Sequence, residues 1–406
     1  MNKVLSQSLS LPCGTLIPNR LAKSAMSEQL ATIKNQPSEE LVRLYTCWAA
    51  GGSGLLISGN VMIDRSTLGE ARNVVVEDES DFAILSRWAS AGKANNTQFW
   101  MQINHPGRQS PRFLSSVPVA PSAIPVKVGG MFATPRALTE KEIERLIERY
   151  AATAAIAKKA GFTGVQIHGA HGYLVNQFLS PLSNQRDDAW GGTPKKRMRF
   201  VLAVARAMRK AVGMRFPVAI KLNSADFQRG GFTEEESMDV VRALADEGLD
   251  LLEISGGTYE SQAMTGTTRQ QRESTRQREA YFLSYAEKVR KLVKLPLMLT
   301  GGFRTATAMT EAITSGAIDI VGMARPLALE PDLPARILNG EAEASKAVFR
   351  LIGIKALDGV IDLMWHTQQL HRIGAGKEPD PTRSPWTVMA VALLEGSWDA
   401  FCRKRA

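Results

Sequence analysis

The sequence predicts an α/β protein, a (β/α)8 TIM barrel with a C-terminal helical extension. Short apolar runs alternate about eight times with segments of helical periodicity, and helix start and stop signals separate them. No Gly-x-Gly-x-x-Gly turn follows the first apolar run, whereas an open doubly wound sheet would favour one. We therefore expect a barrel over residues 1–340 and the extension over residues 341–406.

The eight predicted strands are short and largely apolar, which is typical of parallel strands buried on both faces. They are Leu21–Met26, Leu55–Gly59, Gln98–Ile103, Gly164–His168, Val218–Leu222, Leu249–Ser255, Pro296–Thr300 and Ile318–Gly322. Three Ser/Thr–Glu pairs have the spacing of a capping box at the start of a helix, namely Thr139 with Glu142, Thr233 with Glu236 and Ser284 with Glu287. Glycines stand where three helices should end, at Gly161, Gly248 and Gly316.

The sequence also predicts structure for the segments outside this alternation of strands and helices. The residues before Asn19 predict a short hairpin that plugs the bottom of the barrel. Two long loops, Asn104–Thr139 and Gly256–Ala280, follow the third and sixth strands, on the face where barrel active sites lie. In the extension we expect two helices, around Ile352–Leu370 and Trp386–Phe401.

Composition excludes several classes of protein. Lys and Arg number 50 against 40 Asp and Glu, a surplus of 10 that predicts a solvated basic surface, with no nucleic-acid partner. Three cysteines are too few for a disulfide framework and lack the close spacing of a zinc or iron–sulfur site. The N-terminus shows no apolar signal region and no window predicts a membrane span, so we expect a cytoplasmic protein.

The segment IHGAHGYLVNQFLSP begins at the end of the fourth predicted strand and carries His168, His171 and Tyr173. Two imidazoles can donate hydrogen bonds to one carbonyl oxygen, and a tyrosine beside them can deliver a proton. Metal ligation would need a third ligand, and the nearest carboxylates, Asp187 and Asp188, stand well away in the sequence. We therefore favour a site for an anion or a carbonyl group and predict no metal.

Glycine-bearing turns follow the seventh and eighth strands, in LTGGFRT and VGMARPL. Barrels commonly bind phosphate at these two positions. Gly301 and Gly302 allow close backbone approach, and Arg325 can pair with a phosphate in bidentate fashion. Gln102 and Lys221 end two further strands at the same mouth, so a phosphorylated ring cofactor is favoured.

These motifs resemble those of the Old Yellow Enzyme family of flavin-dependent ene-reductases. The resemblance spans roughly residues 9–340 and rests on HGAHGYLVNQFLSPLSNQRDDAWGG, with NR…SAM, QINHPGR and TGG…GMARP in the expected order. It implies a TIM barrel that binds FMN non-covalently, is reduced by NADH or NADPH, and reduces an activated C=C bond of a small α,β-unsaturated molecule. It leaves homo-oligomerisation open.

The resemblance also assigns roles to residues at matching positions. Those along the flavin ring are Ser24, Ala25, Met26 and Ser27, with Ser27 near O4 and N5. Those at the pyrimidine portion are Asn60 and Gln102, with Lys221 at the N1/O2 edge. Those at the phosphate are Gly301, Gly302, Ala324 and Arg325. His168 and His171 would bind the acceptor oxygen, and Tyr173 would protonate Cα after hydride reaches Cβ.

The chain departs from the family pattern in places. Ala25 stands where many relatives have Pro, Ser27 replaces the usual Cys or Thr, Lys221 stands for a common Arg, and Gln29 stands where one subgroup has a substrate-contacting Tyr. The extension has no assignable counterpart. Packing against the barrel or a dimer contact is the favoured interpretation, and docking at a membrane surface or a partner subunit is the alternative. Two enzyme alternatives remain at this point: a non-flavin phosphate-binding lyase or isomerase with Lys221 as a Schiff-base candidate, and an iron–sulfur dienoyl-CoA reductase.

Overall fold

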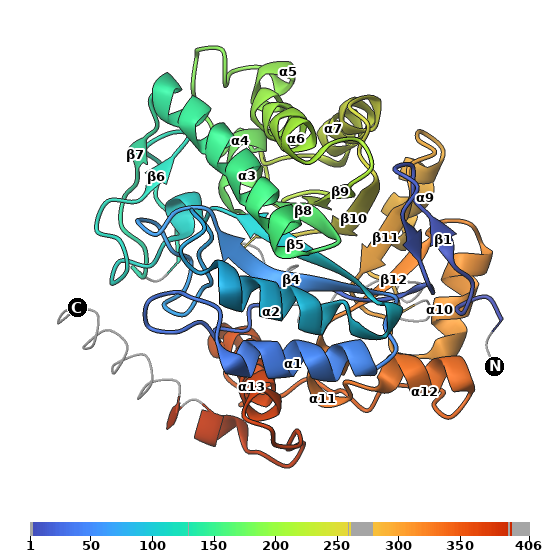
Figure 1. The fold of residues 1–406 in the computed structure, drawn as a ribbon. Helices are drawn as coiled ribbons and strands as arrows, with labels where there is room; N and C mark the ends of the chain where they lie inside the picture. The colour runs from blue at the N-terminus through green and yellow to red at the C-terminus, as the bar shows by residue number, and fades with distance from the viewer. Residues whose placement is uncertain (1–2, 129, 259, 261–278, 389, 392–406) are drawn as a thin grey trace.

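Eight parallel strands close into a barrel, as the sequence predicts (Figure 1). The computed structural model describes residues 3–128, 130–258, 260, 279–388 and 390–391. The barrel strands are β3 (Leu21–Lys23), β4 (Leu55–Met62), β5 (Gln98–Asn104), β8 (Gly164–Gly169), β9 (Val218–Asn223), β10 (Leu251–Ser255), β11 (Leu297–Thr300) and β12 (Ile320–Met323). Each corresponds to a predicted strand, with ends shifted by up to three residues.

Helices follow the strands and form the outer layer of the barrel (Figure 1). They are α1 (Glu39–Ala50), α2 (Phe82–Gly92), α3 (Glu140–Ala160), α4 (Leu174–Leu179), α5 (Pro194–Arg197), α6 (Arg199–Val212), α7 (Glu234–Asp246), α9 (Leu283–Arg290), α10 (Ala306–Thr314), α11 (Arg325–Leu329) and α12 (Leu333–Asn339). Short 3-10 turns lie at η1 (Ala94–Asn96) and η2 (Gly107–Gln109).

Side-chain capping marks the start of some of these helices. Thr139 and Glu142 form the reciprocal capping box predicted for α3, and Thr233 accepts from the Glu236 amide at the start of α7. The prediction for Ser284 is wrong, because α9 begins at Leu283 and its N-cap residue has no side-chain hydrogen bond. Packing of apolar residues stabilises that helix instead, since four of its eight side chains are buried.

The N-terminal hairpin consists of β1 (Leu9–Ser10) and β2 (Leu16–Ile17), which pair antiparallel. Leu11 and Ile17 are buried in one cluster with Leu55 and Leu251, residues at the start of their strands. The hairpin therefore closes the N-terminal end of the barrel, as predicted, and the opposite end remains for a site.

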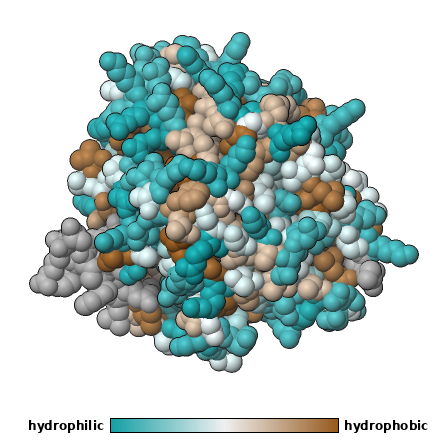
Figure 2. Space-filling model, in the orientation of Figure 1, coloured by the Kyte–Doolittle hydropathy of each residue, from teal (hydrophilic) through white to brown (hydrophobic). Residues whose placement is uncertain are grey.

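The long loop after β5 contains η2 and a small parallel pair, β6 (Val119–Ala120) and β7 (Arg136–Ala137). The charged tract RQQRESTRQRE after β10 lies outside the described residues except for its last residue, Glu279. The face of the molecule seen in Figure 2 is mostly hydrophilic, with separate small hydrophobic areas.

The extension contributes α13 (Lys355–Gly374), which agrees with the first predicted helix. It packs against α1 and α11 beside the barrel (Figure 1). Most of the second predicted helix, Trp386–Phe401, lies outside the described residues. The division of the chain at residue 340 stays a prediction. None of the helices described here is long and apolar enough to cross a membrane.

Candidate active site at the carboxyl ends of the barrel strands

Backbone register places the predicted site residues of β4, β5 and β8 next to one another. Asn60 on β4 is paired with Gln102 on β5, and Gln102 with Gln166 on β8. The Gln102 side-chain amide donates to Gln166 at 2.8 Å. Asn60 and Gln102 are therefore neighbours at one level of the barrel, although 42 positions separate them in the sequence.

A buried ion pair occupies the next strands. The Nζ of Lys221 lies 3.1 Å from a carboxylate oxygen of Glu253, and Glu253 is fully buried. Glu253 also accepts from Gln166 and Thr300, both at 2.7 Å. Sequence reasoning missed Glu253, whose signal is a lone acid within the apolar run LLEIS. Lys221 thus has a counter-ion in the site.

The segment after β3 follows the mouth of the barrel. Ser24 is buried, and its hydroxyl lies 2.7 Å from that of Thr300, while Ala25, Met26 and Ser27 are half-buried. The Ser27 hydroxyl donates to the carboxylate of Glu70. The expectation that Ser27 is a donor to flavin O4 therefore meets a competing acceptor that the sequence did not indicate.

Glu70 is the centre of a small polar cluster. Besides Ser27 it accepts from Gln29 at 3.2 Å and from Asn73 at 3.1 Å. Burial, and the charge of nearby Glu28, raise the pKa of Glu70, whereas its hydrogen bonds oppose that shift. A titratable carboxyl group thus lies directly behind the hydroxyl predicted to face the flavin.

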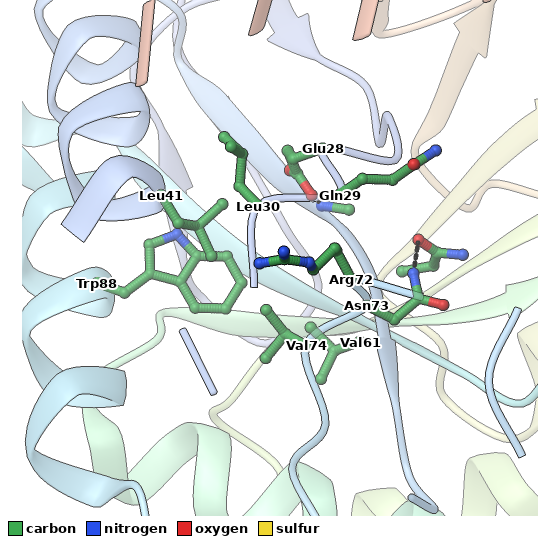
Figure 3. Close-up of a pocket in the computed structure, with 11 residues that line it drawn as sticks. Glu28, Gln29, Leu30, Leu41, Val61, Arg72, Asn73, Val74 and Trp88 are labelled. Carbon is green, nitrogen blue, oxygen red and sulfur yellow. Dashed lines mark hydrogen bonds between the residues drawn. The ribbon is translucent and has the colours of Figure 1, made fainter. Parts of the chain in front are cut away.

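A small pocket adjoins this cluster (Figure 3). Its lining residues are Glu28, Gln29, Leu30, Leu41, Gly59, Asn60, Val61, Arg72, Asn73, Val74 and Trp88. In Figure 3 the side chain of Arg72 extends between Leu30 and Val74, and Asn73 donates to Asn60 at 3.4 Å. One wall is polar and joins Asn60 to the Glu70 cluster, and the other is apolar.

His168, His171 and Tyr173 come together at the end of β8. The His168 ring lies 5.3 Å from that of His171 and 4.7 Å from that of Tyr173, in both cases edge to face. His171 adopts a φ of 60°, unusual for a residue with a side chain, and its amide donates to Asn223 at 3.2 Å. This turn brings three side chains from a stretch of six residues into one group.

Both imidazoles are neutral at physiological pH. Burial, with the charge of Lys221 as a further cause, holds the pKa of His168 and of His171 well below the usual value. The Ala170 amide donates to Nδ1 of His168 at 3.4 Å, which leaves its Nε2 as the donor. The Nε2 of His171 lies 2.8 Å from the Ser255 hydroxyl, so its Nδ1–H is available when Ser255 donates. Two neutral hydrogen-bond donors can thus serve one oxygen.

The predicted phosphate residues lie together after β11 and β12. Gly301 and Gly302 have φ values of 122° and 99°, which glycine readily adopts. Ala324 is the N-cap residue of α11, and Arg325 begins that helix. Sequence reasoning missed Arg304, although it stands within the quoted motif LTGGFRT.

The arginine pair fits a phosphate group. Arg325 and Arg304 lie 4.5 Å and 6.0 Å from the same ring, that of Phe349. Burial and the charge of Arg325 lower the pKa of Arg304. Within the described residues, one buried terminal nitrogen of Arg304 has no hydrogen-bond partner. Two carboxylates lie near the pair: Asp362 beside both guanidinium groups, and Glu279, which accepts from the Arg304 and Thr305 amides at 2.8 Å. The two guanidinium groups and the unused donor suit the phosphate of FMN.

No group of three or more His, Cys, Asp or Glu side chains suited to a metal ion occurs among the described residues. The site is built from hydrogen-bond donors, one buried ion pair and an arginine pair. Such a set can hold a polar ring, an anionic phosphate and an acceptor oxygen.

Comparison with known proteins identifies the family of the chain. Residues 13–343 match the NADH:flavin oxidoreductase / NADH oxidase family. The NADH-dependent flavin oxidoreductase iliE of Neonectria sp. (strain DH2) is 38% identical over 80% of this chain, which spans only about half, 46%, of that protein. The NADH-dependent flavin oxidoreductase iccE of Talaromyces variabilis is 34% identical over 91% of this chain and 98% of its own length.

A solved structure of an old yellow enzyme homologue from Zymomonas mobilis superimposes with a TM-score of 0.72 at 26% identity, over 85% of this chain and 95% of the other. Together these matches show that the alternative of a non-flavin lyase or isomerase is wrong. The chain belongs to the NADH:flavin oxidoreductase / NADH oxidase family, with the Old Yellow Enzymes, and is an FMN-dependent NAD(P)H oxidoreductase.

Proposed function

We propose that this protein is an ene-reductase that reduces the activated C=C bond of a small α,β-unsaturated carbonyl or nitro compound. The observation that carries the proposal is the packing of His168, His171 and Tyr173 at the end of β8. Neutral imidazoles can donate hydrogen bonds to the acceptor oxygen without transferring a proton to it. The names of the fungal relatives support NADH as the hydride donor.

When bound, FMN would supply the chemistry of hydride transfer between the nicotinamide and the acceptor. Ser24 to Ser27, Asn60, Gln102 and Lys221 would hold the ring, and Gly301, Gly302, Ala324, Arg325 and Arg304 the phosphate. The charge of Lys221, which would face the ring, is partly offset by its ion pair with Glu253.

His168 and His171 withdraw charge from the acceptor oxygen and thereby polarise the C=C bond toward Cβ. Negative charge that develops on the oxygen as hydride arrives is stabilised by the same two hydrogen bonds. Tyr173 then gives its phenolic proton to Cα, which completes the saturated product, and water restores the tyrosine proton. The burial of Tyr173 and His168 limits competing proton transfer from solvent.

The proposal is tested with the double variant His168→Ala/His171→Ala and with the single variants His168→Ala and His171→Ala. The double variant should retain FMN but lose binding of a phenolic ligand, measured by the change in the flavin absorption spectrum. Loss of a single donor should lower the rate of 2-cyclohexenone reduction by about 10²–10³. Unchanged ligand binding in the double variant would remove both histidines from the acceptor site.

A further inference from the structure

Helix α13 of the extension contacts both ends of the proposed cofactor site. A carboxylate oxygen of Asp362 lies 3.4 Å from the guanidinium of Arg325. Nine positions further along, Nε2 of His371 lies 2.9 Å from the carbonyl oxygen of Glu28, next to Ser27. At 1.5 Å per residue these contacts are about 14 Å apart along the helix. One helix outside the barrel thus borders the phosphate residues and the segment predicted to lie along the ring.

Asp362 is held in a fixed position. It is 2% exposed, and one of its carboxylate oxygens accepts from the Arg350 amide at 2.8 Å while the other faces Arg325. His366, on the same face of α13, lies 3.6 Å from this carboxylate. Burial lowers the pKa of His366, so at neutral pH the charged groups beside Asp362 are the guanidinium groups of Arg325, which is the nearer contact, and Arg304.

A negatively charged neighbour such as Asp362 stabilises the pair formed by Arg304 and Arg325. Arg304 and Arg325 carry like charges beside one aromatic ring, and repulsion between them favours conformations that move the guanidinium groups apart. A carboxylate anchored by a backbone amide restrains Arg325 and offsets part of this repulsion. Arginine side chains lose considerable rotamer freedom when they bind a ligand, and a restrained one has less to lose.

We propose that Asp362 is a positioning residue for the cofactor phosphate, and that α13 is therefore part of the FMN site. The proposal rests on the assignment of Arg325 to the phosphate. Asp362 acts through Arg325 and does not itself contact the cofactor. The extension thereby gains a role that the sequence did not indicate.

FMN and riboflavin distinguish this role from general structural support, because they share the ring and the ribityl chain and differ in the phosphate. The full-length chain is freed of flavin and titrated with each, following the quenching of flavin fluorescence. Asp362→Asn should weaken FMN binding about tenfold or more, as loss of a supporting contact does at metal sites, and leave riboflavin binding unchanged. Asp362→Glu should recover part of the FMN affinity.

Asp358→Asn is the matched control. Asp358 lies on the same helix and accepts from the Ile352 and Gly353 amides at 2.9 Å and 3.0 Å, but within the described part of the chain it forms no hydrogen bond or ion pair with either arginine. This variant should bind both flavins like the wild type. Thermal unfolding followed by circular dichroism confirms that each variant is folded before it is titrated.

Three results would overturn the proposal. Equal weakening of FMN and riboflavin would mean that Asp362 only supports the fold. Tighter FMN binding in Asp362→Asn would mean that the carboxylate competes with the phosphate. Unchanged binding of both would mean that it has no role. Arg325→Gln tests the assignment of Arg325 to the phosphate separately. If this variant leaves the ratio of FMN affinity to riboflavin affinity unchanged, that assignment is wrong.

Discussion

Lys221 and Glu253 form an ion pair of 3.1 Å between neighbouring strands, and both side chains are buried. Removing one charge leaves the other unpaired inside the barrel, where it is poorly solvated. We therefore expect Glu253→Gln to lower the free energy of unfolding by about 3–5 kcal/mol, measured by urea denaturation.

Glu247→Gln provides the comparison for an exposed pair. Glu247 bonds Arg206, whose side chain is 60% exposed, so its loss should cost no more than about 1 kcal/mol. Equal effects of the two substitutions would show that the Lys221–Glu253 pair gains nothing from its burial.

Glu70 should influence the reduction potential of the bound flavin through Ser27. A carboxylate near the ring opposes the negative charge of the reduced flavin, and an amide does not. Glu70→Gln should therefore shift the midpoint potential to a more positive value, measured by anaerobic dye-coupled titration. Ser27→Ala should also change the potential. An unchanged potential in both variants would mean that this cluster lies away from the ring.

Tyr173→Phe tests the proton donor. If Tyr173 delivers the proton to Cα, its loss should slow reoxidation of the reduced flavin by 2-cyclohexenone about 10²–10⁴-fold, while reduction by NADH stays near the wild-type rate. Tyr285→Phe is the control, since Tyr285 is a buried tyrosine whose hydroxyl lies 2.6 Å from that of Ser237. Similar reoxidation rates in the two variants would exclude Tyr173 as the donor.

Stability should fall on acidification because of a buried neutral histidine. Burial lowers the pKa of His105 from 6.5 to about 4. Between these values the unfolded chain binds a proton that the folded chain does not, so the free energy of unfolding decreases as pH falls from 6.5 toward 4. At about 1.4 kcal/mol per pH unit, His105 contributes a loss of about 2 kcal/mol at pH 5.

The measurement is urea unfolding at pH 7.5 and pH 5 for the wild type and for His105→Asn. Asparagine can still accept the hydrogen bond that Gly107 donates to His105 at 3.0 Å, but it does not titrate. The variant should lose less stability between the two pH values. The same loss in both proteins would assign the acid sensitivity to other groups.

The sequence predicted the barrel well because strand and helix signals are local. Strand ends at Ser255 and Thr300 follow from short apolar runs, and the α3 capping box follows from two residues three positions apart. The error at Ser284 shows the limit of such rules, since burial of one helix face, a tertiary property, fixed the start of α9.

The polar partners of the site could not be predicted in the same way. Glu70 and Asp362 join Ser27 and Arg325 across 43 and 37 positions of sequence, so only the closed barrel and the docked α13 bring them together. Arg304 could have been predicted from the sequence, because it stands two residues after Gly302 in the phosphate turn. The roles of the residues that match the family pattern stay predictions until variants are measured.

The most direct test of the central claim is an anaerobic absorption experiment on the purified protein. NADH and then 2-cyclohexenone are added while the flavin spectrum is followed. The account predicts a yellow protein that bleaches with NADH and regains its colour with the enone, with formation of cyclohexanone. A flavin that bleaches but is not reoxidised by enones or nitroalkenes would contradict ene-reduction as the function of this site.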